Sequence, residues 1–241
     1  MAGVKITRKE IKRDELATTI GSLAGILEGH RRSLAIAAAA LLLLALAVVG
    51  GVWFSHGREA DSLTALASVQ KAVSAQSAEE ATPGQSGAAR YATRHERFQD
   101  VLRLADQVLT DHPSSRAARW ASYYKAVALK ELGSHDDALK EVMSLTGSTQ
   151  DEFVSASARV LQAQIQEAKG DLAGAAEVYA NLAASAPTRF PIDFALINQA
   201  RLLDAQGRKE EALEVYRRVS QDFPESPFAG EASRHLQPER G

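Results

Sequence analysis

The sequence predicts an all-α chain in which a single N-terminal transmembrane helix is followed by a solenoid of about four stacked helix pairs. Two observations carry this prediction: an uncharged apolar run near the N-terminus, and a spacing of 37 residues that recurs in the second half of the chain. The composition agrees with it, because aromatic residues make up only 6% of the chain and Val, Ile and Thr never alternate with polar residues as they do in strands.

The first element is the run 34–54, LAIAAAALLLLALAVVGGVWF, which contains 21 residues and no charge. At about 1.5 Å of rise per residue such a helix is roughly 30 Å long, which matches the hydrocarbon core of a bilayer. A buried globular helix would carry polar residues on one face. A cleavable signal peptide would be shorter and would end at small residues rather than at Trp53 and Phe54. We therefore predict an uncleaved transmembrane helix over 33–55.

The charges on either side of this run predict its orientation. Residues 1–32 contain seven basic side chains and an amphipathic stripe of Leu16, Ile20, Leu23 and Leu27, whereas Arg58 is the only basic residue between the run and Lys71. Positive segments stay on the cytoplasmic side of a membrane. The prediction is a single-pass protein of the inner (plasma) membrane, with 1–32 in the cytoplasm and 56–241 in the periplasm or its equivalent.

Composition and motifs limit the chemistry that the chain can perform. The net charge is -2, and with the basic excess confined to 1–32 the remainder is acidic, which argues against a nucleic-acid partner. The chain has no cysteine, its six histidines are scattered, and it has neither a phosphate-binding loop nor a nucleophile elbow. Acidic pairs such as Asp136 with Asp137 begin predicted helices, where carboxylates favour the helix dipole. We predict no enzyme, no metal and no other cofactor.

Beyond the run, a helical pattern continues through Ala60, Leu63 and Ala67 and ends near Gln76. Residues 77–90, SAEEATPGQSGAAR, are small and polar around a Pro-Gly pair, which is the composition of a linker. A second helix is expected over 91–111, closed by Pro113. The linker therefore splits the first helix pair.

A repeat follows, marked by glycines that are 37 residues apart. A period in the range of about 20 to 50 residues indicates stacked structural repeats. Glycine suits the turn between two antiparallel helices because it adopts positive φ, alanine suits the closest approach of helices, and proline ends a helix. The residues that share this frame are Gly133, Gly170 and Gly207; Ala121, Ala158 and Ala195; Ala126, Ala163 and Ala200; Ala138, Ala175 and Ala212; Tyr179 and Tyr216; and Pro187 and Pro224.

This combination resembles the tetratricopeptide repeat. The last copy matches the signature of the family most fully, at Leu196, Ala200, Leu203, Gly207, Ala212, Tyr216 and Pro224. The copy around Gly133 has Val142 in place of the aromatic residue. The chain departs from the family in its period, which is 37 rather than 34, and at Lys125, Gln162 and Gln199, where the repeat usually has an apolar residue.

The resemblance implies that the first helix of each pair lines a concave groove that binds proteins or peptides. Carried over by position, the candidate partner-binding residues are Trp120, Tyr123, Val127, Lys130, Val160, Gln164, Glu167, Phe194, Ile197, Arg201 and Asp204. The alternative interpretation is that Trp120, Tyr123 and Phe194 pack between helix pairs, since aromatic residues at helical spacing are commonly buried.

Two further likenesses bear on function. Pro113, Ser115, Ala118 and Ala121 recur as a P-x-S-x-x-A-x-x-A pattern from Pro224, which resembles tetratricopeptide proteins of the bacterial envelope, and residues 226–236 are expected to cap the solenoid. The layout of the whole chain is similar to the ancillary subunit of the SecYEG translocon.

The expected function is therefore a membrane-anchored scaffold near the Sec translocon. Its expected partners are translocon subunits, periplasmic chaperones or exported clients. The alternative is a coordinator of envelope assembly or cell division. An unrecognised cell-wall hydrolase is a third possibility, but the sequence nominates no catalytic carboxylate for it.

Overall fold

A computed structural model of the chain describes residues 31–80, 90–147, 151–185, 187 and 190–237. Within α2 the side chains of 31–35, 37–39 and 47–57 lie outside this description, as does Gly147 in α5. The chain divides into two compact units, Met1–Gly57 and Arg58–Gly241, which are described separately.

Helix α2, Arg31–Ser74, begins in the first unit and ends in the second. Six of its apolar side chains, Ile36, Leu41, Leu42, Leu43, Leu44 and Leu46, are 59–71% exposed. A search of the described residues finds no helix that is both long and apolar enough to span a bilayer. Much of the predicted span 33–55, and the amphipathic stripe between residues 16 and 27, fall on residues outside the description. The membrane anchor therefore stays a prediction.

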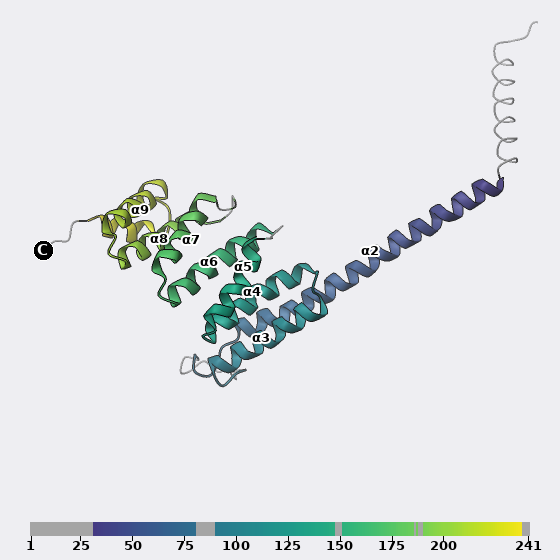
Figure 1. Cartoon of the computed structure of the whole chain (residues 1–241), viewed down its shortest axis with the longest axis horizontal. Helices are drawn as coiled ribbons and strands as arrows, with labels where there is room; N and C mark the ends of the chain where they lie inside the picture. Colours follow the sequence, from purple (N-terminus) through teal and green to yellow (C-terminus); the bar gives the residue numbers. More distant parts are fainter. Residues whose placement is uncertain (1–30, 81–89, 148–150, 186, 188–189, 238–241) are drawn as a thin grey trace, which may run out of the picture. The chain divides into compact units, whose positions relative to one another are not determined.

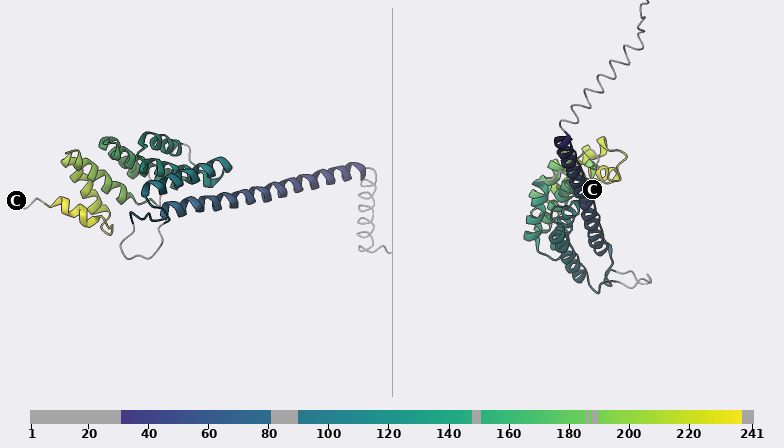
Figure 2. Two further views of the ribbon diagram at one scale, coloured as in Figure 1. Left: turned by 90° about the horizontal axis from the view of Figure 1, so that it is seen from below. Right: turned by 90° about the vertical axis from the view of Figure 1, so that its right-hand side faces the viewer.

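The second unit is a solenoid of antiparallel helix pairs, in which neighbouring helices follow one another side by side (Figures 1 and 2). We call the first helix of each pair the A helix and the second the B helix. The pairs are the part of α2 from Arg58 with α3 (Arg94–Asp111); α4 (Arg116–Glu131) with α5 (His135–Gly147); α6 (Glu152–Ala168) with α7 (Leu172–Ser185); and α8 (Ile192–Ala205) with α9 (Lys209–Asp222). The helix α10 (Ala229–Leu236) closes the solenoid. The predicted all-α solenoid with four pairs and a terminal helix is confirmed.

Glycine forms the turn inside each of the last three pairs, as the spacing of 37 predicted. Gly133, Gly170 and Gly207 have φ of 82°, 82° and 76°. At the first turn the Ser134 N–H donates to the Leu129 carbonyl over 2.8 Å, and equivalent bonds close the other two. A Cβ atom added at any of the three glycines would meet nothing within 4 Å. Glycine is therefore required at these positions by the positive φ of the backbone and not by a lack of space for a side chain.

The first pair is joined differently, because the predicted linker interrupts it. The ends of the linker are held together: the Ala78 N–H donates to the Tyr91 carbonyl over 2.9 Å, and the Glu80 carboxylate accepts from the Ser77 hydroxyl over 2.8 Å. The same carboxylate accepts from the buried guanidinium of Arg97 over 3.0 Å. Only the middle of the linker, 81–89, lies outside the described residues.

The two 37-residue intervals of the repeat reach this length in different ways, through the 17-residue helix α6 between Gly133 and Gly170 and through the connection 186–191 between Gly170 and Gly207. The A-to-B turns 132–134, 169–171 and 206–208 are all equally short, whereas the B-to-A connections 186–191 and 223–228 are longer. Helices α3, α7 and α9 each end two residues before a proline, at Pro113, Pro187 and Pro224. Proline therefore ends these B helices as predicted, and after α7 and α9 a longer connection follows it.

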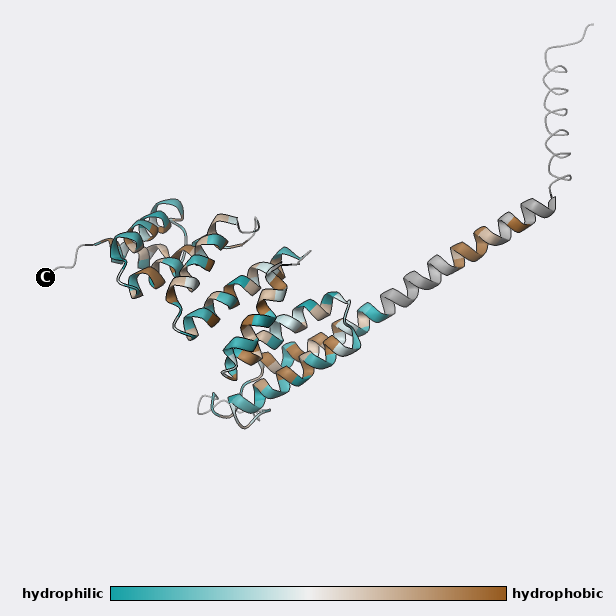
Figure 3. Cartoon of the chain, in the orientation of Figure 1, coloured by the Kyte–Doolittle hydropathy of each residue, from teal (hydrophilic) through white to brown (hydrophobic). Residues whose placement is uncertain are grey.

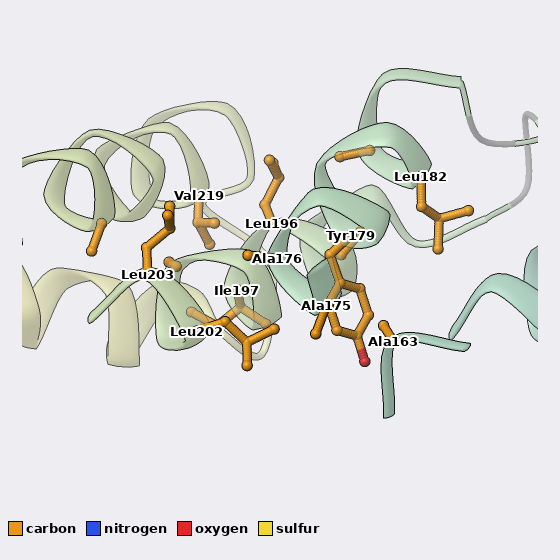
Figure 4. Packing of buried hydrophobic residues seen from close by; sticks show 14 of the residues in the cluster. Ala163, Ala175, Ala176, Tyr179, Leu182, Leu196, Ile197, Leu202, Leu203 and Val219 are labelled. Carbon is orange, nitrogen blue, oxygen red and sulfur yellow. The ribbon is translucent and has the colours of Figure 1, made fainter. Parts of the chain in front are cut away.

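Buried residues form three clusters along the solenoid, and hydrophilic and hydrophobic positions alternate along its helices (Figure 3). One cluster joins α2, α3 and α4, the next joins α4, α5 and α6, and the third extends from α6 to α10. The third cluster buries Tyr179 and Tyr216, and Figure 4 shows the Tyr179 ring beside Ala163 and Ala175. The middle cluster has Val142 at the corresponding position and buries no aromatic residue fully.

Candidate functional site

The predicted groove residues lie on the A helices α4, α6 and α8, as the repeat frame requires. Ile197 is fully buried, so its side chain belongs to the core of the solenoid. Glu167 and Arg201 are exposed, and the remaining members of the set are half-buried. Whether a partner binds this face stays a prediction, but the structure divides the set into two parts with different surroundings.

The α4 part of this face is built from three aromatic rings. Trp120 lies edge-on to Tyr123 at 5.7 Å between ring centroids, and Tyr123 lies edge-on to Tyr124 at 5.5 Å. Trp120 packs against two of the core clusters and Tyr123 packs against one of them, which is the packing role expected under the alternative interpretation. Tyr124 was not among the predicted residues, although two consecutive tyrosines on an A helix could have drawn attention to it.

The Tyr123 hydroxyl has no hydrogen bond to any described residue, in contrast to Tyr124, whose hydroxyl accepts from Gln70 over 3.5 Å. Burial, and to a smaller extent the neighbouring Tyr124, raises the pKa of Tyr123 above its ordinary value. The phenol therefore stays neutral and can donate a hydrogen bond to a ligand.

The adjacent A helix, α6, continues this open surface. Val160 and Gln164 are half-buried there, and the Gln164 carboxamide has no hydrogen bond to the described part of the chain. Together with Tyr123 and Val127 of α4, these residues form what we call the α4–α6 face. Val127 and Val160 also pack against the core clusters, and beside them the Tyr123 and Gln164 side chains have no hydrogen-bond partner among the described residues.

The α8 part of the predicted groove is occupied by contacts within the chain. The Arg201 guanidinium donates to both carboxylate oxygens of Glu231 on α10, over 2.7 and 2.5 Å. These hydrogen bonds lower the pKa of Glu231 and raise that of Arg201. Asp204 lies 4.0 Å from His235 of α10, and Phe194 packs between Tyr179 and Phe228. The α8 residues therefore bind the terminal helix.

Lys125 shows how the chain accommodates a polar residue where the family usually has an apolar one. Its ammonium group lies 2.8 Å from Asp106 on α3 and 3.9 Å from Glu141 on α5. The hydrogen bond to Asp106 raises the pKa of Lys125. This side chain therefore links two successive B helices on the side away from the α4–α6 face.

The P-x-S-x-x-A-x-x-A pattern has a structural explanation. At its first occurrence the Ser115 hydroxyl accepts from the Ala118 N–H over 3.1 Å and caps α4, while Ala118 and Ala121 are buried. At the second, the Ser226 hydroxyl accepts from the Phe228 N–H over 3.1 Å just before α10. The pattern marks the entry to an A helix and is explained by folding.

No group of three or more metal-ligating side chains occurs among the residues that the structure describes. The face contains no arrangement of nucleophile and base among the contacts given above. What it offers is a surface for non-covalent binding.

Comparison with known proteins supports the repeat assignment over one pair. A family model described as tetratricopeptide repeat matches residues 194–226, which comprise most of α8, all of α9 and part of the connection after it. No curated protein matches the chain.

Two solved structures are similar to this chain. They are the putative kinesin light chain nearly identical TPR-like repeats of Podosopora anserina and a form of the same protein with one substitution. Each is 17% identical with a TM-score of 0.48, and each match covers 58% of this chain and 76% of the other. Repeats of this kind are in general scaffolds that bind proteins or peptides.

Proposed function

We propose that this protein is a membrane-anchored scaffold that binds partner or client proteins through its α4–α6 face, at the outer side of the inner membrane and close to the Sec translocon. The observation that carries the binding proposal is the face itself. Tyr123 and Gln164 present hydrogen-bonding groups without a partner among the described residues, beside half-buried Val127 and Val160. Such a mixture of aromatic, apolar and unpaired polar groups is typical of the centre of a protein interface.

The membrane anchor is proposed from the sequence together with the exposure of α2. The run 34–54 has no charge, and its described leucines expose more than half of their surface. Exposed leucines on successive positions of a helix need an apolar environment to cover them. The charges before the run favour a cytoplasmic N-terminus. Proximity to the translocon rests on the similarity of layout alone.

The alternative role in envelope assembly or division rested on the P-x-S-x-x-A-x-x-A pattern. Since that pattern caps α4 and precedes α10, it favours no particular partner. We therefore carry the translocon-associated scaffold forward as the single proposal.

Photocrosslinking in native membranes tests the binding face. A photoreactive residue replaces Tyr123 in the full chain, and the matched control places it at Glu177, an exposed position on the B helix α7. We expect crosslinks to translocon subunits or emerging polypeptides from position 123 and far fewer from position 177. The same products from both positions, or none from position 123, would refute the proposed face.

Charge insertion tests the anchor separately. The double substitution Leu43→Lys with Leu44→Lys places two charges in the middle of the run, where each costs about 3 kcal/mol in a bilayer. The altered chain should be released from membranes by alkaline extraction. Leu63→Lys is the control, because Leu63 is also 50% exposed but lies outside the run. Release of the control, or retention of the double variant, argues against the anchor.

A further inference from the structure

The first turn of α4 has a charge pattern unlike that of the other described helices that begin in the second unit. It contains Arg116 and Arg119 and no acidic residue. Helices α3, α5, α6, α8, α9 and α10 all have Asp or Glu in their first turn, and α7 is preceded by Asp171, which accepts from the Gly174 N–H. Cations near a helix N-terminus oppose the helix dipole, so this pattern is unfavourable for folding.

Arg119 has no acidic partner within the described part of the chain to offset that cost. It is half-buried, its Nε atom is buried without a hydrogen bond, and no described residue forms an ion pair with its guanidinium. The internal segments outside the description, 81–89, 148–150, 186 and 188–189, contain no Asp or Glu. A buried or half-buried cation is normally paired.

Arg116 is only loosely engaged. Its Nε atom lies 3.6 Å from the Asp151 carboxylate, and its side chain is 67% exposed. The other oxygen of Asp151 accepts from the N–H groups of Phe153 and Val154 at the start of α6. Asp151 therefore serves mainly as the cap of α6. The two terminal nitrogen atoms of the Arg116 guanidinium have no partner among the described residues and can bind a ligand.

Tyr123 lies one helical turn beyond Arg119 and on the same side of α4, because residues four apart share a helix face. Three donors without a full set of partners are thus gathered at one end of the α4–α6 face. The backbone N–H group of Ala118 is already satisfied by Ser115, so the side chains, not the helix end, carry the binding capacity.

We infer that Arg116, Arg119 and Tyr123 receive a carboxylate side chain from an acidic peptide segment of the partner, and this inference rests on the proposed scaffold function. The planar guanidinium groups match the two oxygens of Asp or Glu, and the Tyr123 hydroxyl supplies a further donor. Apolar residues of the same segment contact Val127 and Val160. The positive charge of Arg119, which has no acidic partner among the described residues, thus favours an acidic occupant by complementarity.

The test measures binding of two labelled probe peptides to the full chain in detergent micelles by fluorescence anisotropy. One peptide alternates Glu and Leu, and the other has Gln in place of every Glu. We expect the Glu peptide to bind about tenfold more tightly at low salt, since one charge-assisted hydrogen bond accounts for about that factor. The preference should fall as salt is raised.

Variants connect this preference to the site. Arg119→Gln should remove most of the preference for the Glu peptide. Arg119→Lys keeps the positive charge but loses the planar guanidinium group, so it should retain part of this preference. Arg217→Gln is the matched control, because Arg217 is exposed on the B helix α9 without a partner among the described residues, and it should retain the full preference. The melting temperature of each variant establishes that it is folded.

Several outcomes overturn the inference: equal binding of the two peptides, binding of neither, or a preference that survives Arg119→Gln. Binding of anionic phosphatidylglycerol vesicles that depends on Arg119, without a preference for the Glu peptide, would also overturn it in favour of lipid headgroups. Crosslinking from position 123 is independent of these measurements. If it recovers protein partners while the peptides show no preference, the acidic occupant is wrong and the scaffold function stands.

Discussion

The α8–α9 pair and the α4–α5 pair follow the same repeat frame but use it differently. The α8–α9 pair buries Tyr216 where the α4–α5 pair has Val142, and it ends before Pro224, whereas α5 ends without a proline. The basic residue of its A helix, Arg201, is hydrogen-bonded to Glu231 of α10. In the α4–α5 pair, Arg119 and the Tyr123 hydroxyl have no such partner among the described residues.

This difference separates folding from binding along one solenoid. In the α8–α9 pair, Arg201 and Asp204 of the A helix contact α10 and an aromatic ring fills the core, and this is also the pair that the family model matches. In the α4–α5 pair a valine takes the place of that ring, and the Arg119 and Tyr123 side chains have no hydrogen-bond partner among the described residues. Binding sites commonly depart from the arrangement that best stabilises a fold, which is why we place the candidate site on α4.

The largest expected difference between the pairs lies in their cores. Tyr216→Ala removes a ring that is 1% exposed and should lower the free energy of unfolding by about 3–5 kcal/mol. Val142→Ala at the corresponding position removes only two methyl groups and should cost about 2 kcal/mol. Urea unfolding followed by circular dichroism measures both. Equal losses would mean that the two pairs do not differ in their dependence on this position.

The glycine turns should behave alike in both pairs. Gly133→Ala and Gly207→Ala each force a side chain into positive φ, at about 1 kcal/mol, while the added Cβ meets no atom. Asn at either position should cost less, because it tolerates this conformation better than other residues. The same unfolding measurement provides the values. A much larger loss at one turn would reveal a packing constraint that the open surroundings of these glycines do not predict.

These turns and cores could be predicted from the sequence because each depends on local conformation. Gly133, Gly170 and Gly207 recur at a fixed period since each turn needs positive φ, and Pro113, Pro187 and Pro224 mark helix ends since proline cannot continue a helix. The hydrogen bond between Glu80 and Arg97 could not be predicted in this way, because it joins a residue of the linker to the helix α3 that follows it.

A smaller effect is expected from acid at the end of the solenoid. The hydrogen bonds from Arg201 lower the pKa of Glu231, so the carboxylate form stabilises the folded chain above the ordinary pKa, and this contribution is lost as pH falls through the lowered value. Both side chains are partly exposed, so the contribution is about 1 kcal/mol or less. Melting temperatures between about pH 6 and pH 3 should fall more steeply for the native chain than for Glu231→Gln. If the melting temperatures of the two chains fall in parallel with pH, the contact between Arg201 and Glu231 does not contribute to the acid sensitivity of the fold.

The candidate site was only partly predictable. The repeat frame placed Tyr123, Val127, Val160 and Gln164 on A helices, but it treated Arg201 and Ile197 as equivalent to them. Arg201 is bound by α10 and Ile197 is buried in the core, and both results depend on how the helices pack. The spacing of residues in the sequence does not specify this packing. Arg119 was missed because its significance lies in the absence of an acidic partner among the described residues, and that absence becomes visible only when the neighbouring helices are in place.

The smallest expected effect is a gain in stability of the folded chain in a variant that loses binding. Arg119→Gln removes a cation from the first turn of α4, where it opposes the helix dipole, and should stabilise the chain by about 0.5 kcal/mol. For a unit of this size the melting temperature should rise by about 1–2 °C. Asp193→Asn on α8 provides the opposite case, because it removes a favourable charge from the first turn and replaces the charged acceptor of the Ser226 hydroxyl with a weaker neutral one, so it should lower the melting temperature.

If Arg119→Gln instead destabilises the chain, the arginine contributes to folding, and the contrast between the two pairs disappears at this position. If the variant is more stable and has also lost the preference for the Glu peptide, the arginine is maintained at a cost to the fold. That combination is the one expected of a binding residue, since a residue selected for stability alone would not oppose the dipole of its own helix.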